Sequence, residues 1–235
     1  MAELGFDCVD VWRVDLDVSD QLCADLRSVL SDHECQRADR FRVEPPRRQY
    51  TVARGTLRHI LSRYLDTPPE EIGLSYGPQG KPQLTDATDQ PDICFNVSHS
   101  QDLALVAVAR RKHVGVDVEH IDREVRHEEL ARRFFSAHEV AAMERMAPAE
   151  RRIAFFACWT RKEAFLKAKG TGLQLPLSQF DVSVNPDEPA QLLRVGWDPD
   201  EVDRWELHSL EVRQGYLAAM AVDGPTEIRY RCALG

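Results

Sequence analysis

The part of the sequence that most constrains the fold is a run of three strand-like segments between residues 92 and 121. These segments follow one another closely and read DICFNVSHS (92–100), LALVAVAR (103–110) and HVGVDVEHI (113–121). Their alternation and their β-branched residues are typical of β-strands. Because the middle segment is apolar almost throughout, we expect it to be a strand that is buried on both faces.

Helices are expected on both sides of this run, because apolar residues recur there at helical spacing. The predicted helices cover residues 19–41, 47–65, 123–146 and 148–170. The pair Pro45-Pro46 is expected to separate the first two helices, and Gly170 is expected to end the last one. Further strands are predicted at residues 10–16, as a sheet edge, and at 180–184, 205–212, 216–222 and 228–232.

Helices and strands therefore come in blocks, without strict alternation. This order favours an α+β fold with a mostly antiparallel sheet over a doubly wound parallel sheet. With 235 residues, the chain is long enough for one large domain or two small ones. The phrases RADRF (37–41) and ARRFF (131–135) fall in corresponding places of the two halves, but they are too short to establish an internal repeat.

The composition argues against several functions. A net charge of −9 disfavours broad binding to DNA or RNA, which needs many cationic side chains. The N-terminus lacks the pattern of a secretory signal, and the longest apolar run, residues 103–109, is too short to cross a membrane. We therefore expect a cytoplasmic protein that does not bind nucleic acid or membranes. Its six scattered cysteines are expected to be free thiols.

Two acidic residues interrupt the third strand-like segment. Asp117 and Glu119 lie two positions apart, so on a strand both carboxylates point to the same face and repel each other. That face is either exposed to solvent, as in many antiparallel sheets, or it binds a divalent cation such as Mg²⁺.

A third acid lies on the last of the predicted helices. Trp159, Glu163 and Leu166 share one helical face, which places Glu163 on the side expected to pack inward. An inward-facing carboxylate needs a partner or a metal ion. Lys167 lies one turn further on, so the alternative is an exposed Glu163–Lys167 pair that stabilises the helix slightly.

Three other segments carry groups that can bind anions. Ser98 and His99 stand where a strand is expected to run into a turn, and Lys81 lies in the loop GPQGKP. Arginines gather within and just beyond QRADRFRVEPPRRQY, and they form either a phosphate site or a solvated helix face with interleaved acids. These arginines are Arg37, Arg40, Arg42, Arg47, Arg48 and Arg54. Acids for Mg²⁺ and cations for phosphates together describe one kind of site.

Five phrases occur in the order and spacing seen in a known enzyme family. GKP, FNVSHS, GVDVE, RFFSAHE and WTRKEAFLKAKGTGL resemble the motifs of 4′-phosphopantetheinyl transferases of the large, surfactin-synthetase-activator type. The match runs from about Arg37 to Leu177. It implies Mg²⁺-dependent transfer of phosphopantetheine from coenzyme A to a serine hydroxyl of an apo acyl or peptidyl carrier protein. The other product is adenosine 3′,5′-bisphosphate.

The resemblance also implies an architecture. The family fold is a pseudo-dimer, in which two similar α+β halves of one chain hold coenzyme A and Mg²⁺ in the cleft between them. Residues 1–112 are expected to form the half on the adenine and 3′-phosphate side. Residues 113–235 are expected to form the half with the metal and the catalytic carboxylates. Such a chain is expected to be a monomer.

By position, three acids resemble the metal ligands of the family: Asp117, Glu119 and Glu163. Glu163 also resembles the base that acts on the carrier serine. Lys167 resembles the residue near the α-phosphate that stabilises the leaving group. Glu139 matches an acid near the metal.

The remaining expected site residues match contacts to coenzyme A. They are Arg37, Arg48, Lys81, Ser98, His99 and Lys162, together with Lys167. His99 and Arg37 match contacts to the 3′-phosphate, and Arg37 replaces a lysine there. This replacement keeps the charge but changes the hydrogen-bonding geometry.

Two other functions are open on the residues alone. A two-metal nuclease or phosphatase would use the same acids, but it needs more His and Asp ligands than the sequence offers. A module that binds coenzyme A or a carrier without turnover would not need Glu163 or Lys167. The sequence does not identify the carrier. Its docking surface is expected near Arg132, Arg133 and residues 171–173.

Overall fold

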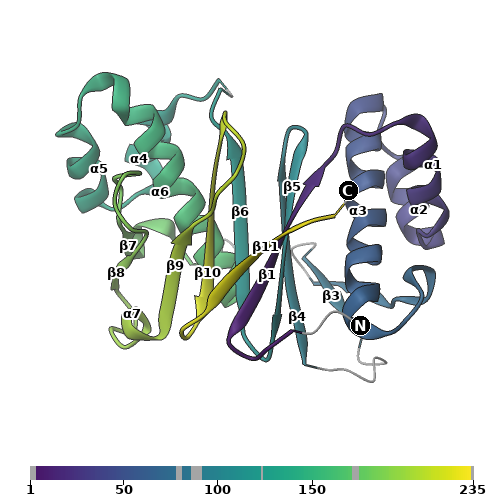
Figure 1. The fold of residues 1–235 in the computed structure, drawn as a ribbon. Helices are drawn as coiled ribbons and strands as arrows, with labels where there is room; N and C mark the ends of the chain where they lie inside the picture. The colour runs from purple at the N-terminus through teal and green to yellow at the C-terminus, as the bar shows by residue number, and fades with distance from the viewer. Residues whose placement is uncertain (1–3, 78–80, 86–91, 123, 171–174, 234–235) are drawn as a thin grey trace.

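The structure, a computed structural model, describes residues 4–77, 81–85, 92–122, 124–170 and 175–233. Its main elements form four layers, in which two β-sheets lie between two groups of helices (Figure 1). This arrangement confirms the α+β class that the blocks of helices and strands predicted. Within the described residues, no helix combines the length and the apolarity needed to span a membrane.

The first half of the chain provides one sheet and one group of helices. Its elements are β1 (Cys8–Asp15), α1 (Asp20–Ser28), α2 (Asp32–Asp39), α3 (Glu44–Leu65), the 3₁₀ turn η1 (Pro69–Glu71), β2 (Leu74–Tyr76), β3 (Pro82–Leu84), β4 (Ile93–Ser100) and β5 (Leu103–Arg110). Strand β5 pairs antiparallel with both β1 and β4 and is buried from Leu103 to Ala109, as predicted. Helices α1 and α3 cover one face of this sheet.

The second half has a similar plan. Its elements are β6 (Val114–His120), α4 (His127–Phe134), α5 (Ala137–Glu144), α6 (Pro148–Lys169), the 3₁₀ turn η3 (Leu177–Gln179), β7 (Phe180–Val182), β8 (Leu192–Val195), α7 (Glu201–Arg204), β9 (Trp205–Ser209), β10 (Tyr216–Asp223) and β11 (Glu227–Cys232). Strand β10 pairs antiparallel with β6 and β9, as β5 does with β1 and β4. Apolar side chains of β1, β5, β6 and β10 fill the layer between the two sheets.

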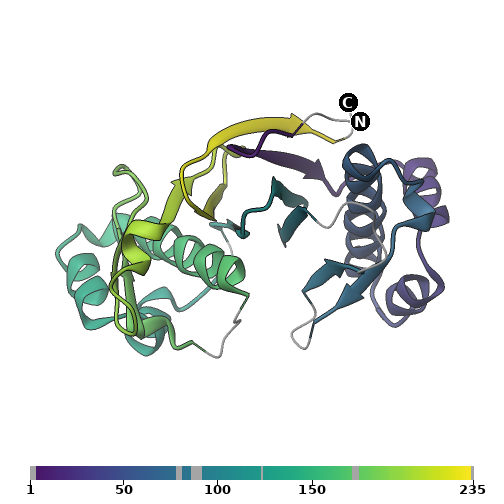
Figure 2. The same cartoon turned by 90° about the horizontal axis from the view of Figure 1, so that it is seen from below.

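The C-terminal strand β11 crosses back to the first sheet and pairs parallel with β1 (Figure 2). Strand β1 therefore lies inside the sheet, and the expectation of an edge strand at residues 10–16 is wrong. Arg229 of β11 donates a hydrogen bond of 2.8 Å to the buried carboxylate of Asp10, which ties the crossing strand to β1. Strand β11 comes from the second half of the sequence but joins the sheet of the first half. The expected division between residues 112 and 113 stays a prediction.

Two helices that the periodicity predicted as continuous are each split by a serine cap. Ser31 precedes α2 and Ser136 precedes α5, and each serine forms a capping box with the glutamate three residues later. The predicted single helices over residues 19–41 and 123–146 are therefore wrong. Pro45 and Pro46 lie within the first turn of α3. Proline is tolerated there because N–H groups at a helix start have no intrahelical acceptor.

The two capping boxes belong to an internal repeat. Glu34 and Glu139 are both buried, and each forms an ion pair at 2.8 Å with a basic residue of a long helix. The basic residues, Arg58 of α3 and Lys162 of α6, occupy the same position in two helices of 22 residues each. Each long helix ends at a residue with left-handed backbone conformation. These equivalences confirm the two similar halves that the family resemblance implied.

The repeat does not coincide with the phrases RADRF and ARRFF. RADRF lies at the end of α2, which is equivalent to α5, whereas ARRFF lies in α4. The two halves thus resemble each other at the positions of the cap and the ion pair. The serine and the glutamate are the same in both halves, whereas the basic residue is Arg58 in one and Lys162 in the other.

We predict that replacing the buried lysine of the second half destabilises the fold. Lys162→Met keeps most of the side-chain volume but leaves the Glu139 carboxylate buried without its cation, which costs about 3–5 kcal/mol. Urea unfolding at pH 7 measures the loss. The matched control Arg126→Met breaks an exposed ion pair with Glu129 and is expected to leave the midpoint unchanged. Equal midpoints for Lys162→Met and the parent protein would contradict a structural role for this lysine.

Candidate active site

A glycine allows the acidic strand β6 to lie directly against helix α6. A Cβ atom on Gly115 would lie 2.1 Å from the carbonyl oxygen of Ala164 and 2.3 Å from the backbone nitrogen of Ala168, so a larger residue would force the two elements apart. The alternate valines of β6 face the layer between the sheets. Asp117 and Glu119 therefore point to the α6 side, which confirms that both acids share one face.

Asp117 is the most buried of the three predicted metal ligands, and its two oxygens have different surroundings. Oδ1 accepts hydrogen bonds from Ser98 Oγ of β4 at 2.8 Å and from Lys167 Nζ of α6 at 2.7 Å. Oδ2 is buried and has no hydrogen-bond partner among the described residues. A buried carboxylate oxygen without a donor is unfavourable, so this oxygen marks a position that suits a cation.

Glu119 lies one step further along the same face and is half-buried. Its Oε2 accepts a hydrogen bond of 3.1 Å from Ser100 Oγ, which in turn accepts one from the His120 amide. Strand β4 thus provides a serine opposite each acid of β6. The two serines orient both carboxylates on the face toward α6.

Glu163 of α6 feels the charge of both strand acids. Burial and, next, the negative charge of Asp117 raise the pKa of its carboxyl group to about 6, although the Lys167 ammonium opposes the shift. Glu119 adds a smaller upward contribution. The three carboxylates predicted to act together therefore lie within electrostatic reach of one another, although two come from a strand and one from a helix.

The described residues contain no group of three His, Cys, Asp or Glu side chains already arranged to hold a metal ion. Lys167 instead places its ammonium on Asp117, where it offsets part of the negative charge. The bare oxygen of Asp117 and the raised pKa of Glu163 nevertheless fit a hard divalent cation, since such ions prefer carboxylate oxygens. The residue types suit Mg²⁺, but their side chains do not form a complete coordination site.

Lys81, Ser98 and His99 lie beside this acidic site. Ser98 Oγ accepts a hydrogen bond of 2.9 Å from Lys167 Nζ, and Lys81 Nζ donates one of 2.7 Å to the Lys167 carbonyl oxygen. Burial lowers the pKa of Lys81, and the nearby Lys167 lowers it further. The His99 ring reaches the surface, but partial desolvation lowers the pKa of its imidazole, as do the charges of Lys167 and Arg54. The structure thus brings these three predicted residues together with the acids.

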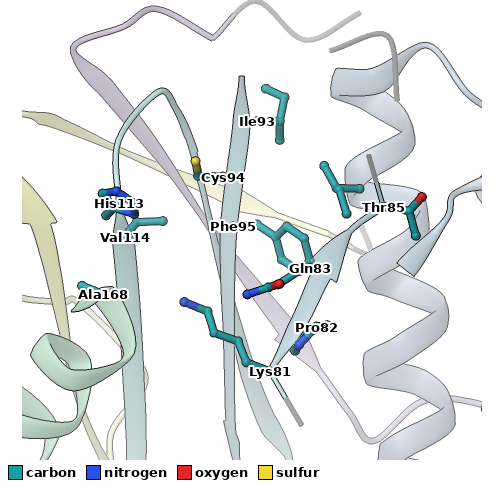
Figure 3. Close-up of a pocket in the computed structure, with 11 residues that line it drawn as sticks. Lys81, Pro82, Gln83, Thr85, Ile93, Cys94, Phe95, His113, Val114 and Ala168 are labelled. Carbon is teal, nitrogen blue, oxygen red and sulfur yellow. The ribbon is translucent and has the colours of Figure 1, made fainter. Parts of the chain in front are cut away.

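A pocket of about 460 Å³ adjoins the site between β3, the start of β4 and the end of α6 (Figure 3). Its wall combines polar groups such as Lys81 and Gln83 with apolar ones such as Phe95 and Ala168. Lys81 belongs to both the pocket and the acidic site, because its amine bonds to the carbonyl oxygen next to Ala168. The volume lies in the range of cavities that bind small molecules and cofactors.

A second group of cations lies on the first half, between α2, α3 and β2. The guanidinium of Arg37 lies 5.6 Å from the ring centre of Tyr50 and 5.8 Å from that of Tyr76. The corresponding distances for Arg54 are 5.5 and 5.3 Å. We call these four residues the arginine–tyrosine cluster. Arg54 belongs to the arginine group predicted as a possible phosphate site, but it was not among the residues matched to coenzyme A contacts. Its spacing of four residues from both Tyr50 and Arg58 places all three on one helical face.

The structure does not bring the remaining predicted contacts into this site. Arg48 donates hydrogen bonds to Asp20, at 2.8 Å, and to the carbonyl oxygen of Val18. Lys162 is fully buried, and it donates to Leu177 and Phe180 carbonyl oxygens in addition to its ion pair. Coenzyme A therefore cannot reach the Lys162 side chain. The expectation that Lys162 contacts coenzyme A is corrected, because the structure gives this lysine a structural role.

Glu139 is likewise buried, because it caps α5 and accepts the Val182 amide at 2.9 Å. It belongs to the internal ion pair and not to the acidic site. Arg132 pairs with Glu144 on the surface. Residues 171–173, expected near the carrier, lie outside the described residues. All six cysteines are free thiols, as predicted.

Comparison with known proteins assigns the chain to a family. Residues 113–221 match the 4′-phosphopantetheinyl transferase superfamily, and residues 18–111 match the N-terminal region of a 4′-phosphopantetheinyl transferase family. The chain is 37% identical over 218 residues to the 4′-phosphopantetheinyl transferase HetI of Nostoc, with 93% of this chain and 89% of that protein covered. The chain therefore belongs to the 4′-phosphopantetheinyl transferases.

Two further relatives extend the comparison. The 4′-phosphopantetheinyl transferase Sfp of Bacillus subtilis is 28% identical over 198 residues, with 84% of each protein covered, in line with the predicted type. Among solved structures, the holo-[acyl-carrier-protein] synthase of Thermotoga maritima matches 49% of this chain and 64% of its own, with 22% identity and a TM-score of 0.39.

We predict that Glu163→Gln stabilises the protein near neutral pH in metal-free buffer. The pKa of Glu163 is about 6 in the folded chain and 4.5 ordinarily, so the folded state binds more protons than the unfolded state between these values. Stability from this group therefore falls as the pH rises through that window. Removing the charge is expected to raise the free energy of unfolding by about 1–2 kcal/mol at pH 7.5.

The gain is expected to disappear at pH 4, where the Glu163 carboxyl is protonated in both states. Urea unfolding in EDTA at the two pH values measures it. The control Glu211→Gln changes an exposed acid and is expected to have no effect at either pH. A loss of stability in Glu163→Gln at pH 7.5 would contradict repulsion among the acids.

Proposed function

We propose that the acidic site and the pocket beside it carry out the family reaction in this chain. The chain transfers 4′-phosphopantetheine from coenzyme A to a serine hydroxyl of an apo carrier protein and releases adenosine 3′,5′-bisphosphate. The observation that supports this assignment most strongly is the grouping of Asp117, Glu119, Glu163 and Lys167 between β6 and α6. A module that only binds coenzyme A gains nothing from three acids that repel one another.

The residues that would hold Mg²⁺ are Asp117, Glu119 and Glu163. When bound, the ion supplies charge that offsets the diphosphate of coenzyme A and its leaving group. The unpaired Asp117 oxygen supports this assignment. The amine of Lys167, already 2.7 Å from Asp117, is placed to share the negative charge of the site with an incoming phosphate.

Glu163 is the group best suited to accept the proton of the carrier serine. In the metal-free protein its carboxyl has a pKa of about 6, so most of it is ionised at neutral pH and still binds a proton well. A base with a pKa close to the working pH is the most effective kind. Burial and, to a smaller extent, the negative charge of the strand acids thus raise the pKa of the helix acid for this step.

Coenzyme A is proposed to lie across both halves. The pocket next to Lys81 is suited to the nucleoside part, because it combines the Phe95 ring and aliphatic side chains with polar groups. The 3′-phosphate is proposed to lie near His99 and Arg37. Because the acidic site and the pocket are both built from residues of one chain, we propose that a monomer is active. The six free thiols support a cytoplasmic location.

The proposed transfer is tested by incubating the protein with coenzyme A, Mg²⁺ and a panel of apo carrier proteins. Mass spectrometry of the carriers is expected to show a gain equal to phosphopantetheine on at least one of them. The same panel identifies the carrier that this chain serves. If every carrier stays unmodified while coenzyme A binds, the chain is a binding module and the proposal fails.

Two variants are expected to separate the roles of the acids in this assay. Glu163→Gln removes the proton acceptor with little change in shape, and the transfer rate is expected to fall at least a hundredfold, within the usual effect of a lost general base. Glu119→Ala is expected to raise the Mg²⁺ concentration needed for half-maximal rate. Rates equal to that of the Glu211→Gln control would remove Glu163 from the mechanism. An unchanged dependence of the rate on Mg²⁺ concentration in Glu119→Ala would show that Glu119 does not bind the ion.

A further inference from the structure

The arginine–tyrosine cluster is built around one buried carboxylate. Glu34 Oε2 pairs with Arg58 at 2.8 Å, while Oε1 accepts a hydrogen bond of 3.0 Å from the Tyr76 hydroxyl and lies 3.8 Å from Arg54. Burial alone would raise the pKa of Glu34, but the Ser31 amide and Arg58 outweigh it and lower the pKa. Glu34 therefore stays ionised and anchors both Arg54 and Tyr76.

Two hydrogen-bond donors of the cluster are buried without a partner. These are the Tyr50 hydroxyl and Nη1 of Arg54, neither of which has an acceptor among the described residues. Buried donors in folded proteins almost always have an acceptor, and leaving one unpaired is costly. Both groups belong to the same stacked set, since the Arg54 guanidinium lies 5.5 Å from the Tyr50 ring centre. The geometry points to an acceptor that arrives with a ligand.

The chemistry of these donors selects the kind of ligand. A neutral hydroxyl donor beside two guanidinium groups suits an anion with several acceptor oxygens, as a phosphate monoester has. The cluster also lies within electrostatic reach of the acidic site, because the charge of Arg54 lowers the pKa of His99, as Lys167 also does.

We infer that the hydroxyl of Tyr50 binds the 3′-phosphate of coenzyme A directly and so helps to distinguish coenzyme A from its dephosphorylated form. This inference rests on the proposed function. The ring of Tyr50 has a second role, which any aromatic residue can perform. It packs against Phe41, at 5.7 Å between ring centres, and stacks with Arg37 and Arg54.

Tyr76 acts as a positioning residue in the same arrangement. Its ring stacks with both guanidinium groups, and its hydroxyl is bonded to Glu34, so it has no hydrogen bond left to donate to a ligand. Burial and the charge of Glu34 raise the pKa of Tyr76, although Arg54 opposes the shift. The two tyrosines thus differ in the role of the hydroxyl and share the role of the ring.

The inference is tested by calorimetric titration of Tyr50→Phe with adenosine 3′,5′-bisphosphate and, separately, with adenosine 5′-monophosphate. The variant keeps the stacked ring and loses only the donor. It is expected to bind the bisphosphate about tenfold more weakly than the parent protein, the effect of one hydrogen bond to a charged group. Its affinity for the monophosphate, which lacks the 3′-phosphate, is expected to change less than twofold.

The control Tyr230→Phe removes a hydroxyl of β11 that accepts a hydrogen bond from the backbone N–H of Glu211. This variant is expected to bind both nucleotides as the parent protein does. Melting temperatures show whether each variant is folded. The inference is overturned if Tyr50→Phe binds the bisphosphate as tightly as the parent, or if it weakens both nucleotides equally. It is also overturned if the parent does not prefer the bisphosphate.

A second measurement uses the transfer assay and does not depend on calorimetry. The ratio of kcat/KM for coenzyme A to that for dephospho-coenzyme A is expected to fall about tenfold in Tyr50→Phe, mainly through a higher KM for coenzyme A. A ratio equal to the parent value overturns the inference. If no carrier is modified by the parent, the proposed function fails, while a selective loss of bisphosphate affinity still supports Tyr50 as a phosphate-binding residue.

Discussion

The direct contact between strand β6 and helix α6 is the constraint on which the rest of the site depends. Gly115 permits it, and it places two carboxylates of the strand against a carboxyl and an ammonium group of the helix. The acids repel one another, and the raised pKa of Glu163 reflects its burial first and the negative charge of Asp117 second. Lys167 and two serines of β4 offset part of the repulsion. A cation and a phosphate can offset the remainder, which is why the same residues suit phosphoryl transfer.

The two halves of the chain share one arrangement of helix cap and ion pair but use it differently. In both, a serine–glutamate cap is fixed to a long helix by a buried ion pair, with Arg58 in one half and Lys162 in the other. In the second half the pair is closed within the core. In the first half, Glu34 also holds Tyr76 and Arg54. The duplicated cap thereby supports a group of cations in the first half, while the second half provides the acids.

Much of the site could be predicted from the sequence, because local spacing determines it. The two-residue spacing of Asp117 and Glu119 fixes a common face on any strand. The helical position of Glu163 and Lys167 fixes their direction as well. The five motifs then indicated that these segments, distant in the chain, meet in one cleft, which spacing alone does not reveal.

Other features depended on information that local patterns lack. Helical periodicity continues through Ser31 and Ser136, so the caps that divide the helices were missed. Lys162 lies within a matching motif, but only the packing shows that its amine is enclosed with Glu139. The internal repeat escaped notice because it keeps only the serine and the glutamate of a short cap, while its basic partner changes from Arg58 to Lys162. The partners of Arg54 come from three elements and could not be read from α3 alone.

The most direct test of this account is the pKa of Glu163 itself, measured by NMR on protein with ¹³C-labelled glutamate carboxyl groups. In metal-free protein the account predicts a pKa of about 6, shifted downward when Mg²⁺ is added. A value at the ordinary 4.5 in the metal-free protein, or one that does not respond to Mg²⁺, would contradict it. The first result would mean that Glu163 is neither buried nor close to the two strand acids. The second result would mean that the site does not bind the ion.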